Sequence, residues 1–258
     1  MKFFAILSSM PFESEKVLAV FKKVRTDKVA GKTVYSGKLS GHDVLLLNSG
    51  LGKVNAAHSA TCLIENYTVK GVINIGVGGA YPGSGLKIGD VAVASKEIYG
   101  DEGVITSKGW DSLKKIGIPL VKDGQKKYFN EFLLDKKLFT KVKDRVLPNP
   151  LLKKGGCEGG QIKSGPFITV SSITGTSKRA VELEERFNAV CENMEGAAIA
   201  QVCTIYKIPM LEIRGISNIV GERDKRKWNL GLASENCQKL LLKFLCPETE
   251  HDRWNNAT

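Results

Sequence analysis

The sequence predicts an α/β protein in which helices cover both faces of a central, largely parallel or mixed sheet. Two observations carry this prediction. Short runs rich in β-branched residues alternate with amphipathic segments of helical period along most of the chain. In addition, the 258 residues, 42% of them hydrophobic, are enough to bury one large core.

The expected elements follow from this alternation. The expected strands are 3–7, 44–48, 71–75, 90–95, 167–170 and 210–213, and the expected helices are 13–23, 54–65, 178–187, 195–206 and 232–245. A polar segment near 105–165 interrupts the alternation, and its lysines, glycines and prolines are also typical of a linker between domains. Because related motifs lie on both sides of it, we expect an insertion within a single domain, 1–246. The end of the chain, 247–258, has no periodicity and is expected to be a disordered tail.

The cysteines and histidines give no sign of a metal site or a disulfide framework. The six cysteines are scattered without a CxxC pair, and the chain has only three histidines. We interpret the cysteines as free thiols of a reducing cytoplasm, and we expect no metal and no cofactor. No small-residue cleavage site follows the apolar start, so we expect a buried first strand rather than a secretory signal. No stretch has the length needed to span a bilayer.

The formal net charge of +11 raises the question of nucleic-acid binding. Many of the lysines lie between Lys108 and Lys154, in the expected insertion. Basic charge spread over a loop and a helix is usually a solvated face, and no RNA-binding or helix-turn-helix motif accompanies it. We therefore expect no nucleic-acid partner, although the charge can attract an anionic small substrate.

A glycine-rich run follows the third expected strand. Residues 74–83 read NIGVGGAYPG, which brings bare backbone to the carboxyl edge of the sheet, where α/β proteins bind ligands. A dinucleotide fingerprint would need a third glycine at Tyr81, and Lys53 is no P-loop lysine because Val54 replaces the hydroxyl residue. A tight turn without a ligand is the alternative.

Two polar clusters stand beside apolar elements further along the chain. Glu195 opens an expected apolar helix, where a carboxylate is most often only a favourable partner of the helix dipole. Residues 212–218, EIRGISN, end a buried strand in polar side chains that are either caps or site residues. Each cluster alone has a structural explanation, whereas the three motifs in this order predict a site.

In this order, the motifs resemble the superfamily of purine nucleoside phosphorylases and methylthioadenosine/S-adenosylhomocysteine nucleosidases. The resemblance runs from Met1 to about Leu245. Within it, 78–85 (GGAYPGSG), 215–221 (GISNIVG) and 129–132 (FNEF) are similar to futalosine hydrolases, enzymes of an alternative menaquinone pathway. The resemblance implies a nucleoside phosphorylase-like fold, a three-layer αβα architecture with a central twisted mixed sheet. It also implies cleavage of the bond between C1′ of a ribose and N9 of a purine.

The resemblance also implies roles for individual residues. The reaction passes through a ribose with oxocarbenium character, so the site must stabilise positive charge, activate the purine and admit a nucleophile. Met194 and Glu195 match the residues that meet the ribose, and Arg214 is expected to hold the Glu195 carboxylate. Glu13 matches the carboxylate that orients and deprotonates water, its alternative being a first-turn helix glutamate.

The remaining residues carried over by resemblance concern the base and the sugar. Phe167 matches the aromatic residue that stacks on the purine, and the loop backbone at Val77, Gly78 and Gly79 is expected to line the sugar and base.

Two departures from family patterns predict the reaction and the leaving base. Family phosphorylases carry an arginine and a hydroxyl residue where this chain has Asn74 and Val77, so we expect water rather than phosphate as the nucleophile. Adenine-cleaving nucleosidases place an aspartate where this chain has Asn218. The amide cannot deliver a proton but can donate to N7 or to a 6-oxo oxygen, which favours hypoxanthine and therefore futalosine.

Several alternatives stay open. They are a 6-oxopurine nucleoside phosphorylase, a nucleosidase for methylthioadenosine, S-adenosylhomocysteine or aminodeoxyfutalosine, and a metabolite-binding module without chemistry. The partner expected is a small purine nucleoside. The family suggests a homodimer or larger homo-oligomer, and the carboxylate of futalosine would meet Arg223, lysines of the insertion or a second subunit.

Overall fold

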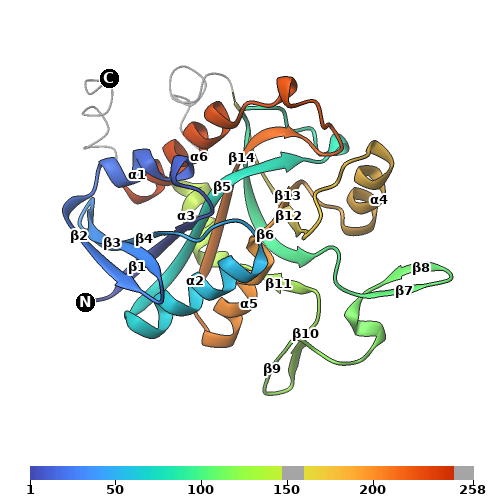
Figure 1. Ribbon diagram of the computed structural model, residues 1–258, viewed down its shortest axis with the longest axis horizontal. Coiled ribbons are helices and arrows are strands. Elements are labelled where there is room, and N and C mark those ends of the chain that lie inside the picture. Colours follow the sequence, from blue (N-terminus) through green and yellow to red (C-terminus); the bar gives the residue numbers. More distant parts are fainter. Residues whose placement is uncertain (147–159, 247–258) are drawn as a thin grey trace.

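The computed structural model describes residues 1–146 and 160–246, and their main feature is one 10-stranded mixed sheet (Figure 1). The strand order is β11-β6-β12-β13-β5-β1-β4-β3-β2, and β14 pairs with both β5 and β6. The strands of this sheet are β1 (Phe3–Ser8), β2 (Lys22–Val29), β3 (Lys32–Leu39), β4 (His42–Asn48), β5 (Val69–Ala80), β6 (Val91–Tyr99), β11 (Glu131–Leu133), β12 (Ile162–Thr169), β13 (Cys191–Asn193) and β14 (Met210–Ile219).

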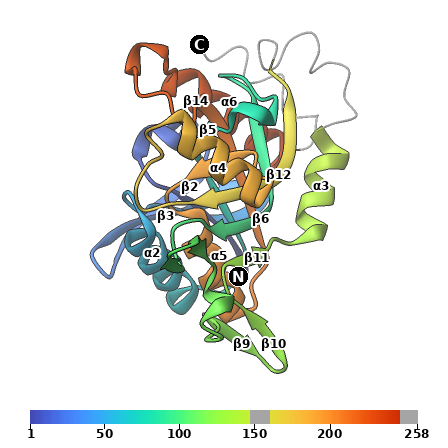
Figure 2. The same cartoon turned by 90° about the vertical axis from the view of Figure 1, so that its right-hand side faces the viewer.

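Helices cover both faces of the sheet, as predicted. They are α1 (Glu15–Ala19), α2 (Lys53–Asn66), α3 (Lys136–Val146), α4 (Ser177–Phe187), α5 (Gly196–Tyr206) and α6 (Leu230–Leu245), with short 3-10 turns η1 (Pro11–Glu13), η2 (Pro82–Ser84), η3 (Leu113–Lys115) and η5 (Lys225–Lys227). Figure 2 shows α3 on the opposite side of the sheet from α2 and α5. The α/β prediction with a mixed central sheet is confirmed.

Alternation along the central strands builds two cores. In β1, Ala5 and Leu7 face the core shared with α2 and α5, whereas Ile6 faces the core shared with α1, α3 and α6. All three side chains are fully buried. A strand apolar on both faces is typical of the interior of a parallel sheet, and β1 pairs in parallel with both β4 and β5.

Two local expectations differ from the structure, and two strands are unexpected. The helix expected over 13–23 is only Glu15–Ala19, because β2 begins at Lys22 and pairs antiparallel with β3. The sequence pattern does not predict the strands β2 and β3. The expectation of a loop at 77–79 is wrong, because β5 continues through these residues to Ala80. The strand β14 pairs with this part of β5, with Gly215 opposite Val77 and Ile216 opposite Gly78.

The segment expected to be an insertion is divided between the sheet and two hairpins. The hairpins β7 (Val104–Thr106) with β8 (Gly109–Asp111), and β9 (Val121–Asp123) with β10 (Lys126–Tyr128), project from the body (Figure 1). The strands β11 and β12 instead pair with β6 in the main sheet. The predicted single domain with an insertion stays a prediction, and the expected tail at 247–258 lies outside the described residues.

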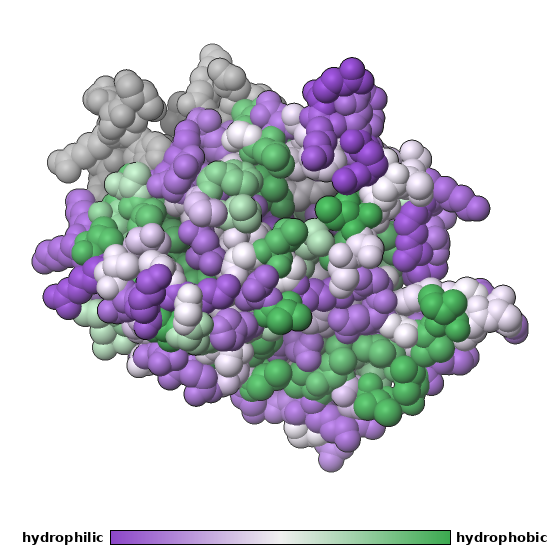
Figure 3. Space-filling model, viewed as in Figure 1, coloured by the Kyte–Doolittle hydropathy of each residue, from purple (hydrophilic) through white to green (hydrophobic). Residues whose placement is uncertain are grey.

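The projecting hairpins and their neighbours carry apolar side chains on the surface. Ile105, Ile118 and Leu133 are 79%, 69% and 65% exposed, and Figure 3 shows hydrophobic surface over this part of the molecule. The predicted homo-oligomer stays a prediction for a single chain. None of the described helices is both long and apolar enough to cross a membrane.

Candidate active site

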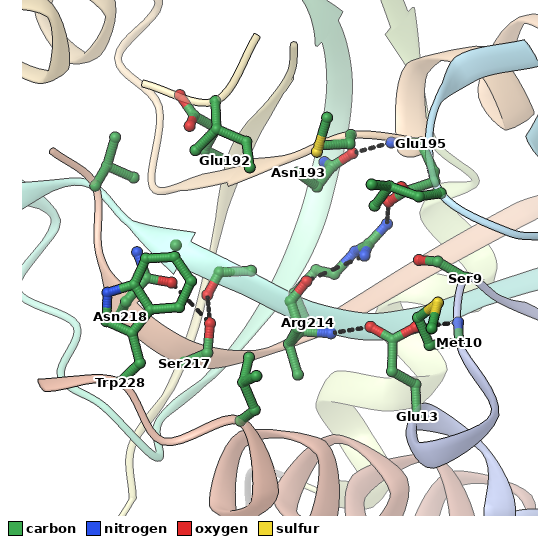
Figure 4. Close-up of a pocket in the computed structure, with 18 of the residues that line it drawn as sticks. Ser9, Met10, Glu13, Glu192, Asn193, Glu195, Arg214, Ser217, Asn218 and Trp228 are labelled. Atoms are coloured by element: carbon green, nitrogen blue, oxygen red, sulfur yellow. Dashed lines mark hydrogen bonds and ion pairs between the residues drawn. The ribbon is translucent and has the colours of Figure 1, made fainter. Parts of the chain in front are cut away.

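A pocket opens where the far ends of β5 and β14 meet the turn before α5 (Figure 4). Eight of the nine predicted site residues line it, all except Phe167. They are Glu13, Val77, Gly78, Gly79, Met194, Glu195, Arg214 and Asn218. The sheet thus brings together residues separated by up to about two hundred positions, as expected for strands that end at one edge.

Glycine in β5 makes room for the charged side chains of the site. A Cβ at Gly76 would lie 2.6 Å from Glu13 Oε1 and 2.8 Å from Arg214 Nη1. A Cβ at Gly78 would lie 2.6 Å from the sulfur of Cys191. The glycine-rich run therefore serves close approach of side chains to a strand backbone, rather than a turn.

Arg214 is the centre of a buried polar network. Its side chain is 1% exposed. Nε donates to Glu212 Oε1 at 2.9 Å, Nη1 donates to the carbonyl of Val77 at 3.1 Å, and Nη2 approaches Glu195 Oε2 at 3.4 Å. The two carboxylates fix the plane of the guanidinium, which contacts Glu195 at the pocket wall, as the family resemblance implies.

Glu195 is presented by the turn that precedes α5. Its Oε1 accepts a hydrogen bond from the Gly52 amide at 3.0 Å. The turn is held by Asn193, whose Oδ1 accepts from the amides of Glu195 at 3.0 Å and Gly196 at 2.7 Å. The carboxylate is thus oriented by two donors on separate elements, and it is 3% exposed.

Glu13 lies in η1, before α1, and it is 2% exposed. Its Oε1 accepts from the Val77 amide at 2.9 Å and its Oε2 from the Met10 amide at 2.8 Å. Burial raises the pKa of Glu13, while the charge of Arg214 and the two backbone donors oppose that shift. A carboxylate that takes up a proton more readily than an ordinary glutamate is suited to act as a general base.

The other end of the pocket holds Asn218 and Trp228, away from Glu13 and Glu195 (Figure 4). The Ser217 hydroxyl lies 2.8 Å from Asn218 Oδ1, to which it can donate, and Asn218 Nδ2 donates to the carbonyl of Ile219 at 3.1 Å. Trp228 is partly buried in the loop before α6. An amide beside an indole is an arrangement that can pair with the edge and cover the face of a planar heterocycle.

Glu192 is a buried pocket residue that sequence reasoning missed. It accepts from the hydroxyl of Tyr81 at 2.9 Å, and from the amide and hydroxyl of Thr174 at 3.0 and 2.5 Å. These bonds hold the loop containing Ile173 and Thr174 against the pocket. Burial raises the pKa of Glu192, and the three donors oppose the shift. The position of Glu192 beside Asn193 in the sequence does not predict these contacts.

The structure does not bring Phe167 to the pocket, which corrects the stacking role expected for it. Phe167 lies within β12, paired to Cys191 of β13 and Glu97 of β6, and it is fully buried in the core beneath α5. Because β12 continues for two residues beyond Phe167, its side chain packs against a face of the sheet and does not stand at the carboxyl end of the strand. The aromatic residues that line the pocket are Phe12 and Trp228.

The protein groups that line the pocket suit the binding of a small organic molecule. Among the residues that the structure describes, no three His, Cys, Asp or Glu side chains are grouped so as to hold a metal ion. The pocket combines apolar walls, backbone groups and a few oriented polar side chains, as small-molecule sites do.

The family model of the phosphorylase superfamily matches residues 3–245. The chain belongs to this superfamily. A 5'-methylthioadenosine/S-adenosylhomocysteine nucleosidase of Bacillus thuringiensis (strain Al Hakam) is 31% identical over 244 residues, which cover 93% of this chain and 97% of that protein. Nucleosidases are N-glycosidic hydrolases, and this predicted enzyme class is confirmed.

Solved structures agree with this assignment. A nucleosidase of the same name from Colwellia psychrerythraea 34H, in complex with adenine, aligns with a TM-score of 0.78 at 27% identity, over 95% of this chain and 94% of that chain. A futalosine hydrolase mutant of Helicobacter pylori strain 26695 aligns with a TM-score of 0.78 at 22% identity, over 95% of this chain and 99% of that one. At that identity the second likeness shows the fold alone.

Proposed function

We propose that the protein hydrolyses the N-glycosidic bond of futalosine and releases hypoxanthine and dehypoxanthinyl futalosine. The observation that carries this proposal is Asn218, an amide rather than a carboxylate, at one end of a pocket whose other end holds Glu195, Arg214 and Glu13. In this assignment Asn218 meets the base, Glu195 the ribose, and Glu13 the water.

The Glu195 end of the pocket is suited to a ribose that gains positive charge. The carboxylate of Glu195 accepts hydrogen bonds from the 2′ and 3′ hydroxyls, and its charge stabilises the developing cation. Its orientation is set before substrate binds, because Arg214 and the Gly52 amide already hold it. Preorganised charge of this kind needs no rearrangement at the moment of reaction.

The choice of water over phosphate rests on the charges lining the pocket. Among the lining residues, Arg214 is the one cation, and it is already engaged by Glu212 and Glu195. Asn74, where family phosphorylases have an arginine, turns its amide to Glu212 at 3.0 Å. A phosphate dianion would meet the carboxylates of Glu13 and Glu195 with no free positive side chain beside it, whereas water can be oriented by Glu13.

The choice of a 6-oxopurine rests on the amide of Asn218. Its NH₂ group donates to N7 or to O6 of hypoxanthine, whereas an ionised carboxylate there would set acceptor against acceptor. When the Ser217 hydroxyl donates to Oδ1 rather than to the Gly78 carbonyl at 3.2 Å, the amide nitrogen is the group left to pair with the base. The NH₂ would exchange its present bond to the Ile219 carbonyl for one to the base.

The second candidate is a nucleosidase for 5′-methylthioadenosine and S-adenosylhomocysteine. It is favoured by the 31% identical relative, which matches nearly the whole chain. The two candidates differ at the base, adenine against hypoxanthine, and share the ribose chemistry of Glu195 and Glu13.

Incubation without phosphate separates these functions. The purified protein is given futalosine, aminodeoxyfutalosine, methylthioadenosine or inosine, and the released base is identified by chromatography. We expect hypoxanthine from futalosine at the highest kcat/KM, with no change in a chelator. Adenine released from methylthioadenosine at a higher kcat/KM would establish the second candidate instead, and a strict need for phosphate would establish a phosphorylase.

Exchange of Asn218 for aspartate tests the reading of the base. We expect Asn218→Asp to weaken transition-state binding of futalosine by on the order of 1 to 3 kcal/mol, because acceptors then face each other at O6 and at the Ile219 carbonyl. Aminodeoxyfutalosine offers a 6-amino donor to the new carboxylate, so relative activity on it rises. The measurement is the ratio of the two kcat/KM values in wild type and variant.

Asn229→Asp is the matched control for this exchange. Asn229 accepts from the Leu232 amide at 3.0 Å as the N-cap of α6, and aspartate caps a helix equally well. The control is expected to leave the substrate ratio unchanged. If Asn218→Asp also leaves the ratio unchanged, Asn218 does not read the base.

A further inference from the structure

Two fully buried carboxyl groups, Glu97 of β6 and Glu212 of β14, lie behind the Arg214 network. Both lie under the first turn of α5, since a Cβ at Gly196 would overlap Glu97 Oε1 and Glu212 Oε2. Neither residue lines the pocket. Glutamates are almost never fully buried unless they are paired, so this arrangement needs a physical explanation.

A shared proton supplies the explanation. Arg214 already bonds Glu212 Oε1, and with both carboxyl groups ionised, Glu212 Oε2 would have no hydrogen-bond partner among the described residues. Burial, together with the neighbouring Glu212, raises the pKa of Glu97 well above its usual value. A neutral Glu97 would donate to Glu212, and the charge of Arg214, which opposes the rise in the pKa of Glu212, favours the ionised form of that partner.

Glu97 also supports the turn that presents Glu195. Its Oε1 accepts from the Asn193 amide nitrogen at 2.8 Å, and its Oε2 accepts from the Thr169 hydroxyl at 2.7 Å. Asn193 in turn takes the backbone amides of Glu195 and Gly196 on its Oδ1. One side chain therefore contacts both supports of the ribose site, namely Glu212 behind Arg214 and Asn193 beneath Glu195.

We propose that Glu97 is a positioning residue for the glycosidic reaction: as a neutral acid it donates to Glu212 and accepts from Asn193, and so fixes Arg214 and Glu195 against the ribose. This inference rests on the proposed role of Glu195. Glu97 does not line the pocket and belongs to none of the sequence motifs.

Among the described titratable groups around the Glu97–Glu212 pair, the others keep one charge state, which leaves the shared proton to the two carboxyl groups. Glu212 and Arg214 of β14 are the charged neighbours. Burial raises the pKa of the thiols Cys191 of β13 and Cys203 of α5, so both stay neutral. Burial also raises the pKa of Tyr99, on the strand of Glu97 itself.

Paired substitutions separate hydrogen bonding from packing. Glu97→Gln keeps the shape, a donor for Glu212 and an acceptor for Asn193, while the Thr169 hydroxyl can turn to Asn193 Oδ1 at 3.0 Å, so this variant is expected to keep kcat close to wild type. Glu97→Met keeps the volume but neither bond, and a shift of the ribose groups by about 1 Å is expected to lower kcat by roughly 100-fold, with KM less affected. Wild-type kcat in Glu97→Met, or loss of kcat in Glu97→Gln as large as in the methionine variant, overturns the proposal.

An infrared measurement tests the proton itself and does not depend on the substrate or on the methionine variant folding. The difference spectrum of wild type minus Glu97→Gln is taken at neutral pH. It is expected to contain the carbonyl stretch of the carboxylic acid of Glu97 and no carboxylate band from that residue. A carboxylate band in its place means that Glu97 is ionised and overturns the inference, while leaving the proposed nucleosidase function standing.

Discussion

The substitution Glu13→Gln is expected to lower kcat by roughly 10²- to 10⁴-fold, the usual contribution of a positioned general base. Glu13 is buried in the pocket wall with its carboxylate fixed by the amides of Val77 and Met10. An amide retains the shape but cannot take a proton from water. The measurement is steady-state release of the base at saturating nucleoside.

The pH profile provides a second readout of the same group. Because the folded-state pKa of Glu13 lies above its ordinary value of 4.5, the reactive carboxylate is lost as pH falls through that raised pKa. Wild-type kcat is therefore expected to decline on the acid side at a higher pH than an ordinary glutamate would give, and Glu13→Gln to lack this limb. Glu15→Gln, on an exposed residue of α1, is the control and should behave as wild type.

The structure adds a cost that charge alone does not suggest. Both oxygens of Glu13 accept a backbone N–H, so a glutamine must turn its NH₂ group toward one of them. The loss of that bond is expected to lower stability by about 1 to 3 kcal/mol. The variant must therefore be shown to be folded at the assay temperature. A folded variant with most of its turnover would remove Glu13 from the role of base.

The sequence predicts the apolar interior of this fold well and its polar margin poorly. The strands β1 and β4 are largely apolar runs, and α2, α4, α5 and α6 are found close to the expected positions. By contrast, β2 is exposed along almost its whole length. With no apolar face to give a period of two, β2 carries no signal of a strand in the sequence. Its partner β3 has two buried residues, Val34 and Leu39, too few and too far apart to set such a period.

The site follows the same division. The site residues that belong to the sequence motifs lie together because they stand near strand ends and at a helix start. The alternation of apolar and polar residues in the sequence predicts these positions. Glu97 could not be found this way: in the run Ala94-Ser95-Lys96-Glu97 it looks like a solvated strand end, yet it is fully buried. Its meaning depends on Glu212, 115 positions away, and only the pairing of β6 with β14 brings the two strands together.

Loss of the guanidinium at position 214 is expected to remove measurable turnover and also to destabilise the fold. Arg214→Met leaves Glu212 and Glu195 buried without their cation, and breaking a buried ion pair from one side costs about 3 to 5 kcal/mol. For a chain of this size, that corresponds to a fall in Tm of roughly 6 to 20 °C. Arg226→Met is the control, because Arg226 pairs with Asp224 at 2.7 Å but is 90% exposed, and screened surface pairs contribute little.

The pH dependence of that destabilisation identifies its cause. Burial already raises the pKa of Glu212, and the charge of Arg214 holds the shift down. Without Arg214 the pKa rises further, and a carboxyl whose folded-state pKa exceeds its unfolded value contributes stability below the unfolded pKa and loses it as pH rises through the folded one. The difference in Tm between wild type and Arg214→Met should therefore widen as pH rises above 4.5, the ordinary pKa of a glutamate. A difference that stays constant over this range would mean that lost packing of the arginine side chain, rather than its charge, accounts for the destabilisation.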